Sequence, residues 1–165
     1  MTTATSQTHA FSETVRGLPQ SAAVLAYAGS LPLIIAALLI VVRSDAYGAA
    51  ARDFMIIYGG VLIVFFGGVR WGVAVMKPEG PTFKSLLGAV APFVAALPVF
   101  FPGDALLKIL FIIAALPVLL IDDLRATRRG SGAPQWYLGV RAPLTILMEA
   151  AFIIAFARML GAGIV

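Results

Sequence analysis

Five stretches of apolar residues, separated by polar or turn-forming residues, dominate the pattern of this chain. Each stretch is close to the ~20 residues that an α-helix needs to cross a bilayer. The predicted membrane spans are residues 22–42, 53–76, 83–101, 105–121 and 142–160. The pattern therefore predicts an all-α integral membrane protein, folded as a bundle of five transmembrane helices.

The connection between the third and fourth spans is very short. It consists of little more than Pro102, Gly103 and Asp104, and the fourth span is itself short. Two interpretations stay open: a tight transmembrane hairpin, or a re-entrant pair of helices that does not cross. Prolines inside the spans do not argue against helices, because neighbouring helices in a membrane satisfy the carbonyl groups that a proline frees.

The first twenty residues are polar and form a separate segment, while residues 21–162 form a single five-span membrane domain. Within the tail, Phe11, Val15 and Leu18 follow the i, i+4, i+7 spacing of an apolar helix face. This spacing fits a short helix lying on the membrane surface. A solvated tail explains the same residues equally well.

Composition narrows the class of protein further. Of the 165 residues, 61% are hydrophobic and only 12% are charged, whereas soluble domains carry about 25% charged residues. The chain has no cysteine, and its one histidine, His9, lies in the polar tail. We therefore expect no thiolate or histidine metal site and no cofactor. The net charge of +4 is explained by basic loops, so we expect no nucleic-acid partner.

The distribution of lysine and arginine predicts the orientation. With five spans, the N-terminal tail and the second and fourth loops lie on one side of the membrane. That side carries most of the basic residues, namely Arg16, Lys77, Lys84, Arg125, Arg128, Arg129 and Arg141. Cytoplasmic loops are enriched in lysine and arginine. We therefore expect the N-terminus inside, the C-terminus outside, and a bacterial or mitochondrial inner membrane.

Two charged residues lie inside predicted spans, where an unpaired charge is costly. Arg70 is seven residues before Lys77, and Glu149 is eight residues after Arg141. At 1.5 Å per residue, both lie at about the same depth, ~10–12 Å from the same face. The sequence predicts that Arg70 and Glu149 form a buried ion pair, which would be either a polar functional site or a structural pin between spans two and five.

Further polar and aromatic residues gather around this pair on the cytoplasmic face and form a predicted cytoplasmic cluster. Its members are Asp122, Asp123, Arg125, Arg141, Thr145, Trp71, Trp136 and Tyr137. Interfacial aromatic residues and retention of positive loops account for most of these side chains. The two aspartates gain nothing from anionic lipid, so we expect at least one of them to pair with Arg70, Arg125 or Arg141. Because no third carboxylate accompanies them, the pair does not indicate a metal-dependent enzyme, and we expect no enzymatic activity.

Small residues recur every fourth position in the second span. Gly60, Gly68 and Gly72 form this stripe together with Val64, and glycine lets another membrane helix approach closely. Packing against another span of the same chain is the simpler interpretation. A dimer interface is the alternative.

Two segments resemble a known family. Gly67-Gly68-Val69-Arg70-Trp71-Gly72, with Trp136-Tyr137 and Arg141-x-x-Leu144-Thr145 downstream, is similar to the bacterial and mitochondrial membrane-protein family that includes transmembrane protein 69. The family often has histidine where this chain has Arg70. Because arginine does not titrate usefully, this difference argues against a proton relay at that position. The resemblance implies an inner-membrane setting and no particular activity.

Two functions remain compatible with these features. The first is an accessory or assembly subunit that packs in a homo-oligomer or a larger membrane complex. The alternative is a small transporter, channel or lipid-handling protein, in which the polar cluster contacts an anionic group such as a lipid headgroup. The bilayer and its anionic headgroups are the expected partners in both cases.

Overall fold

The computed structural model describes residues 19–130 and 133–161, and the regular elements within them are all helices. They are α2 (Gln20–Ala28), α3 (Leu31–Val42), α4 (Ala46–Val75), α5 (Phe83–Phe100), α6 (Ala105–Arg128) and α7 (Gln135–Gly161). Five segments are long and apolar enough to cross a membrane, the first being α2 and α3 together. The predicted fold class is therefore confirmed. His9 and the predicted surface turn at residues 11–18 lie outside the described residues.

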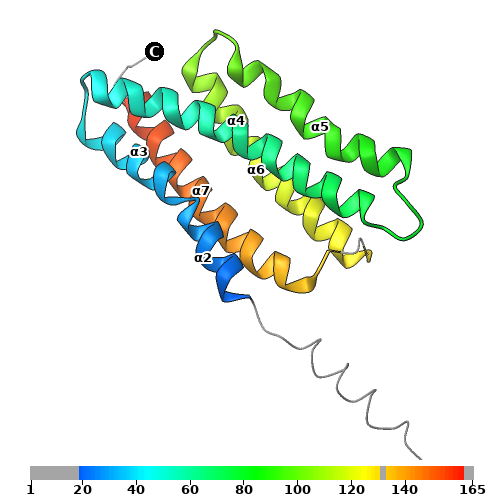
Figure 1. Cartoon of the computed structure of the whole chain (residues 1–165). Helices are drawn as coiled ribbons and strands as arrows, with labels where there is room; N and C mark the ends of the chain where they lie inside the picture. Colours follow the sequence, from blue (N-terminus) through cyan, green and yellow to red (C-terminus); the bar gives the residue numbers. More distant parts are fainter. Residues whose placement is uncertain (1–18, 131–132, 162–165) are drawn as a thin grey trace, which may run out of the picture.

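The helices form a four-membered bundle with one helix attached to its outside. The α2–α3 segment, α4, α6 and α7 surround a common core, in which α4 packs on α3 and α6, and α7 packs on α3 and α6. α5 packs extensively on α4 and makes few contacts with α6, although α6 follows it in the chain. Figure 1 shows α5 at the edge of the molecule, beside α4.

The core is made of aliphatic, aromatic and small side chains from every helix of the four-membered bundle. Leu33, Met55, Ile112 and Phe152 are fully buried in it. The outer faces of the same helices carry exposed apolar side chains, such as Ile146, which is 67% exposed. In water this surface would be unfavourable, but in a bilayer it contacts lipid. The apolar surface is therefore consistent with the five predicted spans.

Three helices extend beyond the predicted apolar runs. α4 begins at Ala46 rather than residue 53, where the Asp45 carboxylate accepts a hydrogen bond from the Tyr47 amide at 3.1 Å and caps the helix. A hydrogen bond from Arg43 lowers the pKa of Asp45, so the cap is charged. α6 continues to Arg128, and α7 begins at Gln135. Residues 122–128 and 135–141, predicted as loop, are therefore helical.

The first span is broken in its middle. Pro32 has no amide hydrogen and disfavours a continuous helix through residues 28–32. The Leu33 amide bonds to Ser30 O rather than to Gly29 O, which leaves the Gly29 carbonyl without a helical partner. The Tyr58 hydroxyl of α4 donates a 2.6 Å hydrogen bond to Gly29 O. α4 thus satisfies the group that the break exposes, as required inside a membrane.

Replacing Tyr58 by phenylalanine tests this interpretation. We expect Y58F to lose about 1 kcal/mol of stability, because the Gly29 carbonyl remains without a partner in an apolar surrounding. The measurement is the melting temperature in mild detergent. The control is Y47F, because Tyr47 is 68% exposed and its ring should tolerate the loss of the hydroxyl. Equal melting temperatures for both variants would show that the bond does not support the break.

Glycines of α4 bring α5 close, but not through the predicted stripe. A Cβ atom on Gly60 would lie 2.8 Å from Phe100 Cζ, and one on Gly67 would lie 2.9 Å from the Ala89 carbonyl oxygen. No described atom lies within 4 Å of a Cβ placed on Gly68 or Gly72. The prediction of intramolecular packing is confirmed for Gly60 and wrong for Gly68 and Gly72. The helix α5 lies on the Gly60–Gly67 side of α4.

Candidate functional site

The candidate residues of the polar cluster meet at one end of the bundle. Because successive helices run in opposite directions, the C-terminal ends of α4 and α6 lie beside the N-terminal ends of α5 and α7 (Figure 1). We call this the basic end, after its concentration of cationic side chains. These are Arg70, Lys77, Lys84, Arg125, Arg128, Arg129 and Arg141.

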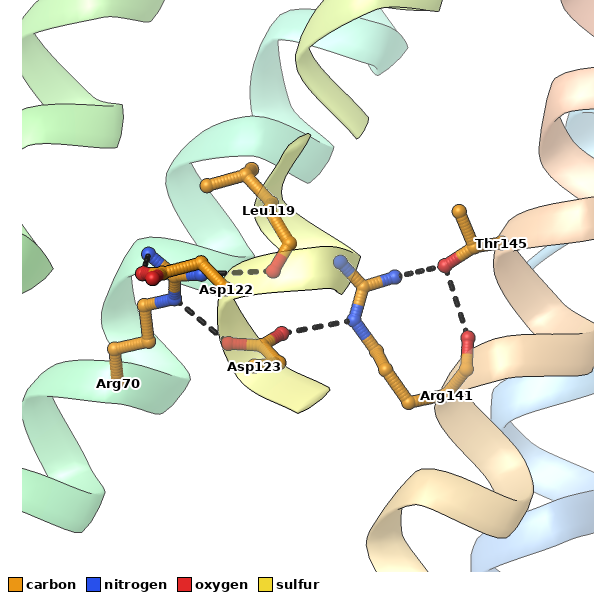
Figure 2. A network of polar contacts seen from close by, with 6 residues as sticks. All are labelled: Arg70, Leu119, Asp122, Asp123, Arg141 and Thr145. Carbon is orange, nitrogen blue, oxygen red and sulfur yellow. Dashed lines mark hydrogen bonds and ion pairs between the residues drawn. The ribbon is translucent and has the colours of Figure 1, made fainter. Parts of the chain in front are cut away.

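Asp123 of α6 is the centre of a charged network that joins three helices. Its Oδ1 accepts a 2.7 Å hydrogen bond from Arg70 Nε of α4, and its Oδ2 accepts one at 3.3 Å from Arg141 Nε of α7. The Asp123 side chain is only 7% exposed. Figure 2 shows the carboxylate between the two guanidinium groups. The prediction that an aspartate of this pair binds one of the arginines is confirmed.

Two further groups of α6 bind Arg70. Its Nη1 lies 2.9 Å from Asp122 Oδ2, and its Nη2 donates a 2.7 Å hydrogen bond to the Leu119 carbonyl oxygen (Figure 2). The Asp122 side chain is 61% exposed, so its contribution to stability is small. Two arginines and two aspartates thus balance in charge, which lowers the cost of placing them within the spans.

Arg141 is the most deeply buried charge of the described chain. It is 1% exposed, and its guanidinium carbon lies 3.3 Å from the centre of the Phe66 ring. Its Nη1 donates to Thr145 Oγ1, and that hydroxyl donates to the Arg141 carbonyl oxygen at 2.9 Å. Its Nη2 has no hydrogen-bond partner among the described residues. The ring face offers this cation a partial electrostatic replacement for water.

The predicted ion pair between Arg70 and Glu149 is wrong. Arg70 binds Asp122 and Asp123 instead. Glu149 lies further along α7, half-buried, and its Oε1 has no hydrogen-bond partner among the residues described here. Equal depth is necessary for such a pair but does not bring two helices face to face. α4 packs on α6 at this level, which brings Asp123 rather than Glu149 to Arg70.

The remaining predicted residues lie around the network or at its edge. Trp71 and Trp136 are exposed at 46% and 37%, as interfacial aromatic residues of a membrane protein usually are. The Trp136 ring contacts Tyr137 edge to face, with 6.4 Å between ring centres. Arg125 is exposed on α6. Tyr137 lines a cavity that adjoins the network, and its side chain also interacts with Arg141, so Tyr137 joins the network at its edge.

This cavity of about 370 Å³ opens at the basic end, between α4, α5, α6 and the start of α7. Arg70, Asp122 and Asp123 form one wall of it. The connection between α4 and α5 and the first turns of α5 also line the cavity. They contribute Lys77, Thr82, Lys84 and Ser85. The cavity volume falls within the range of small-ligand pockets, about 300–1,000 Å³.

The lysines and hydroxyls of this cavity were missed as site residues from the sequence. The sequence marks Lys77 and Lys84 only as indicators of orientation, places Thr82 between the second and third spans, and places Ser85 inside the third span. One signal was available. Thr82 stands directly before an apolar run, and a threonine in that position is typical of a helix start. The Ser85 amide indeed donates to Thr82 Oγ1 at 3.2 Å. In the described ranges, no group of three or more His, Cys, Asp or Glu residues gathers that could hold a metal ion.

The fold and this network define the class: a polytopic helical membrane protein with its buried charges paired at one end of the bundle. Within that class, the sequence profile described as "Protein of unknown function (DUF3429)" matches residues 18–157. The chain belongs to this family. The resemblance predicted from the Gly-Gly-x-basic-Trp-Gly and Trp-Tyr segments is thereby confirmed.

The chain is also similar to Transmembrane protein 69 of Xenopus tropicalis. The two are 29% identical over 136 residues, which cover 81% of this chain and 52% of the frog protein. The chain thus spans about half the length of this curated relative. No solved structure matches the chain.

Proposed function

We propose that this protein binds the phosphate-bearing headgroup of an anionic phospholipid in the cavity at its basic end. It would act as a lipid-handling membrane protein without enzymatic chemistry. The basic end would face the cytoplasm of a bacterial inner membrane, or the matrix if the membrane is mitochondrial, since basic loops are retained on that side. Anionic headgroups are concentrated at such a surface.

The observation that carries this proposal is the pair of lysines in the cavity wall. Lys77 and Lys84 both line the cavity, and no carboxylate of the described residues forms an ion pair with either. The cavity wall thus holds three cations and two carboxylates, and both carboxylates are already bound to Arg70. The positive charge that remains belongs to the lysines, which leaves them to attract an anion.

The local backbone favours the same ligand. Thr82 caps the N-terminus of α5, an 18-residue helix, and this terminus forms part of the cavity wall. Helix N-termini carry a partial positive charge and stabilise phosphate groups. Thr127 also lines the cavity, while the Thr82 and Ser85 hydroxyls already donate hydrogen bonds within the cap. Lysines and a helix N-terminus together suit a phosphate ester better than a cation.

The test compares two double variants that remove the same charge from the same end. K77A/K84A removes the cavity lysines, whereas R128A/R129A removes two exposed arginines that do not line the cavity. A direct hydrogen bond between a lysine and the phosphate contributes about 1 kcal/mol. We therefore expect K77A/K84A to lower the affinity for phosphatidylglycerol by roughly 30-fold. The measurement is titration of phosphatidylglycerol against the purified protein by native mass spectrometry.

Selectivity supplies the control. Phosphatidylcholine, titrated in the same way, should bind weakly to the wild type and to both variants. R128A/R129A should keep most of its affinity for phosphatidylglycerol. If both double variants lose affinity equally, the protein attracts anionic lipid only through its overall charge, and the headgroup site does not exist.

The accessory or assembly role stays a prediction as the second candidate. Its support is the face of α4 at Gly68 and Gly72, where no described atom approaches an added Cβ within 4 Å. Another membrane helix has room to approach there, as small-residue faces allow. Chemical crosslinking and mass measurement in mild detergent test this role. A protein that is strictly monomeric at every detergent concentration would contradict it.

A further inference from the structure

A groove separates α5 from α6 over much of their length. It has a volume of about 690 Å³, and its floor includes Ile63 of α4. The groove exists because α5 packs on α4 and leaves α6 almost untouched. The α5 wall is made of small side chains, whereas the α6 wall alternates small and large ones. The small residues are Gly88, Ala91, Pro92 and Ala95 on α5, and Ala114, Ala115 and Val118 on α6.

The groove is apolar along its length and charged at one end. On α6 its lining extends from Phe111 to Arg125, which is about 21 Å of helix at 1.5 Å per residue. Only the end near the basic end contains charges, contributed by Arg70, Asp122 and Arg125. An occupant must therefore be apolar over most of its length and compatible with cations at one extremity.

The groove adjoins the cavity at the basic end. Arg70, Gly88 and Asp122 line both spaces. Gly88 has no side chain beyond its hydrogen, and among the residues that the structure describes no atom lies within 4 Å of a Cβ placed on it. The passage between the two spaces is therefore not blocked by a side chain at this position of α5. A single molecule with an anionic head and a flexible apolar chain can occupy both.

We propose that the groove between α5 and α6 holds an acyl chain of the phospholipid whose headgroup occupies the cavity, an inference that rests on the proposed function. A lipid chain reaches about half of the ~30 Å hydrocarbon thickness, which the groove length accommodates. Facing alanines leave room for a narrow, flexible chain. Lys77 and Lys84 of the adjoining cavity, and Arg125 at the groove's charged end, complement the phosphate. The protein thus binds the whole lipid along its side rather than the headgroup alone.

The experiment fills the groove with side chains. Ala95 and Ala114 are exposed toward it, so A95F/A114F adds two rings without entering the core. Ala150 is exposed on α7 and does not line the groove, so A150F is the control for an added ring on the membrane surface. Two probes are titrated by native mass spectrometry: dioleoyl phosphatidylglycerol, and glycerophosphoglycerol, which has the same headgroup without chains.

The two probes separate the two proposals. We expect A95F/A114F to lose at least about tenfold in affinity for dioleoyl phosphatidylglycerol and to keep its affinity for glycerophosphoglycerol. K77A/K84A should lose affinity for both. If A95F/A114F binds the diacyl lipid as A150F does, the groove inference fails while the headgroup site stands. If K77A/K84A binds both probes as the wild type does, the headgroup site fails and the groove inference falls with it.

A second measurement uses the wild-type protein and does not depend on how a variant folds. Phosphatidylglycerol with a diazirine on one acyl chain is photoactivated on the protein in nanodiscs, and the labelled residues are mapped by mass spectrometry. We expect labels in residues 91–95 of α5 and 111–118 of α6. Labels spread evenly over the outer faces of all helices would overturn the inference. So would a dimer that A95F/A114F converts to a monomer, since a second copy would then occupy the groove.

Discussion

Replacing Asp123 by asparagine should destabilise this protein by about 3–5 kcal/mol, the largest effect expected of any single substitution in the charged network. The reason is burial. Arg141 is 1% exposed, and Asp123 is its one carboxylate partner in the described chain. In D123N, two arginines share a neutral amide, and the charge of Arg141 stays buried without an anionic partner among the described residues. Folded yield and melting temperature in mild detergent measure the loss.

Neighbouring acidic residues provide two matched controls. D122N removes the same charge one residue earlier, from a side chain that is 61% exposed and contacts Arg70 alone. We expect it to cost less than about 1 kcal/mol. E149Q should not destabilise, since Glu149 forms no ion pair with any described residue and its Oε1 has no hydrogen-bond partner. If E149Q lowers the yield as much as D123N does, the network drawn around Asp123 does not hold the fold.

Replacing Gly67 by alanine is the second substitution with a large expected effect. The added Cβ would lie 2.9 Å from the carbonyl oxygen of Ala89 and 3.3 Å from Pro92 Cβ. Both atoms belong to the rigid part of α5, so neither can rotate away. We expect a loss of about 1–3 kcal/mol, as for other overpacked sites. Because α5 is held mainly by α4, its displacement should also change the width of the groove between α5 and α6.

The adjacent residue offers a control on the same turn of α4. G68A adds an identical methyl group where no described atom lies within 4 Å. We expect no loss of stability in G68A. Melting temperatures of the two variants measure the loss of stability, and their affinity for dioleoyl phosphatidylglycerol reports the change in the groove. A G67A protein that melts with the wild type would show that α4 and α5 are not in the close contact described.

The spans were predictable because they follow from one physical requirement. A segment that crosses a bilayer needs about 20 apolar residues, and this requirement is visible in any single sequence. The ends of the helices were harder to predict from the sequence. α6 continues for seven residues past Ile121, since an amphipathic turn with Asp123 facing inward remains helical after the apolar run has ended. Hydropathy identifies the part of a helix that lies in the membrane core, but it does not show how far the helix continues beyond the core.

The partner of Arg70 illustrates a different limit. The sequence gives the depth of a residue along its helix axis, and by that measure Glu149 and Asp123 are both candidates. It does not give the direction in which each helix faces or which helices are neighbours. The contact of α4 with α6 selects Asp123. For the same reason, the aspartate that binds arginine was predicted correctly, while its place in the centre of a three-helix network was not.

The spacing of the glycines in α4 shows the same limit of the sequence. The predicted stripe follows a four-residue step from Gly60 to Gly68 and Gly72, yet the two glycines that meet α5 are Gly60 and Gly67. Contact residues spaced by seven positions stay on the face that meets a neighbouring helix in a left-handed pair. Small residues spaced by four positions are typical of right-handed helix pairs. Both patterns are present in the sequence, and only the crossing of α4 with α5 decides which one is used.

The sequence alone determined that this protein is a five-span helical membrane protein, which residues are too polar for their depth, and which side carries the basic charge. These properties depend on local composition and on distance along one helix. The tertiary structure decided the network around Asp123, the isolation of Glu149, and the cavity and groove beside α5. Those features depend on how helices are rotated and which ones touch, and packing between distant segments sets both.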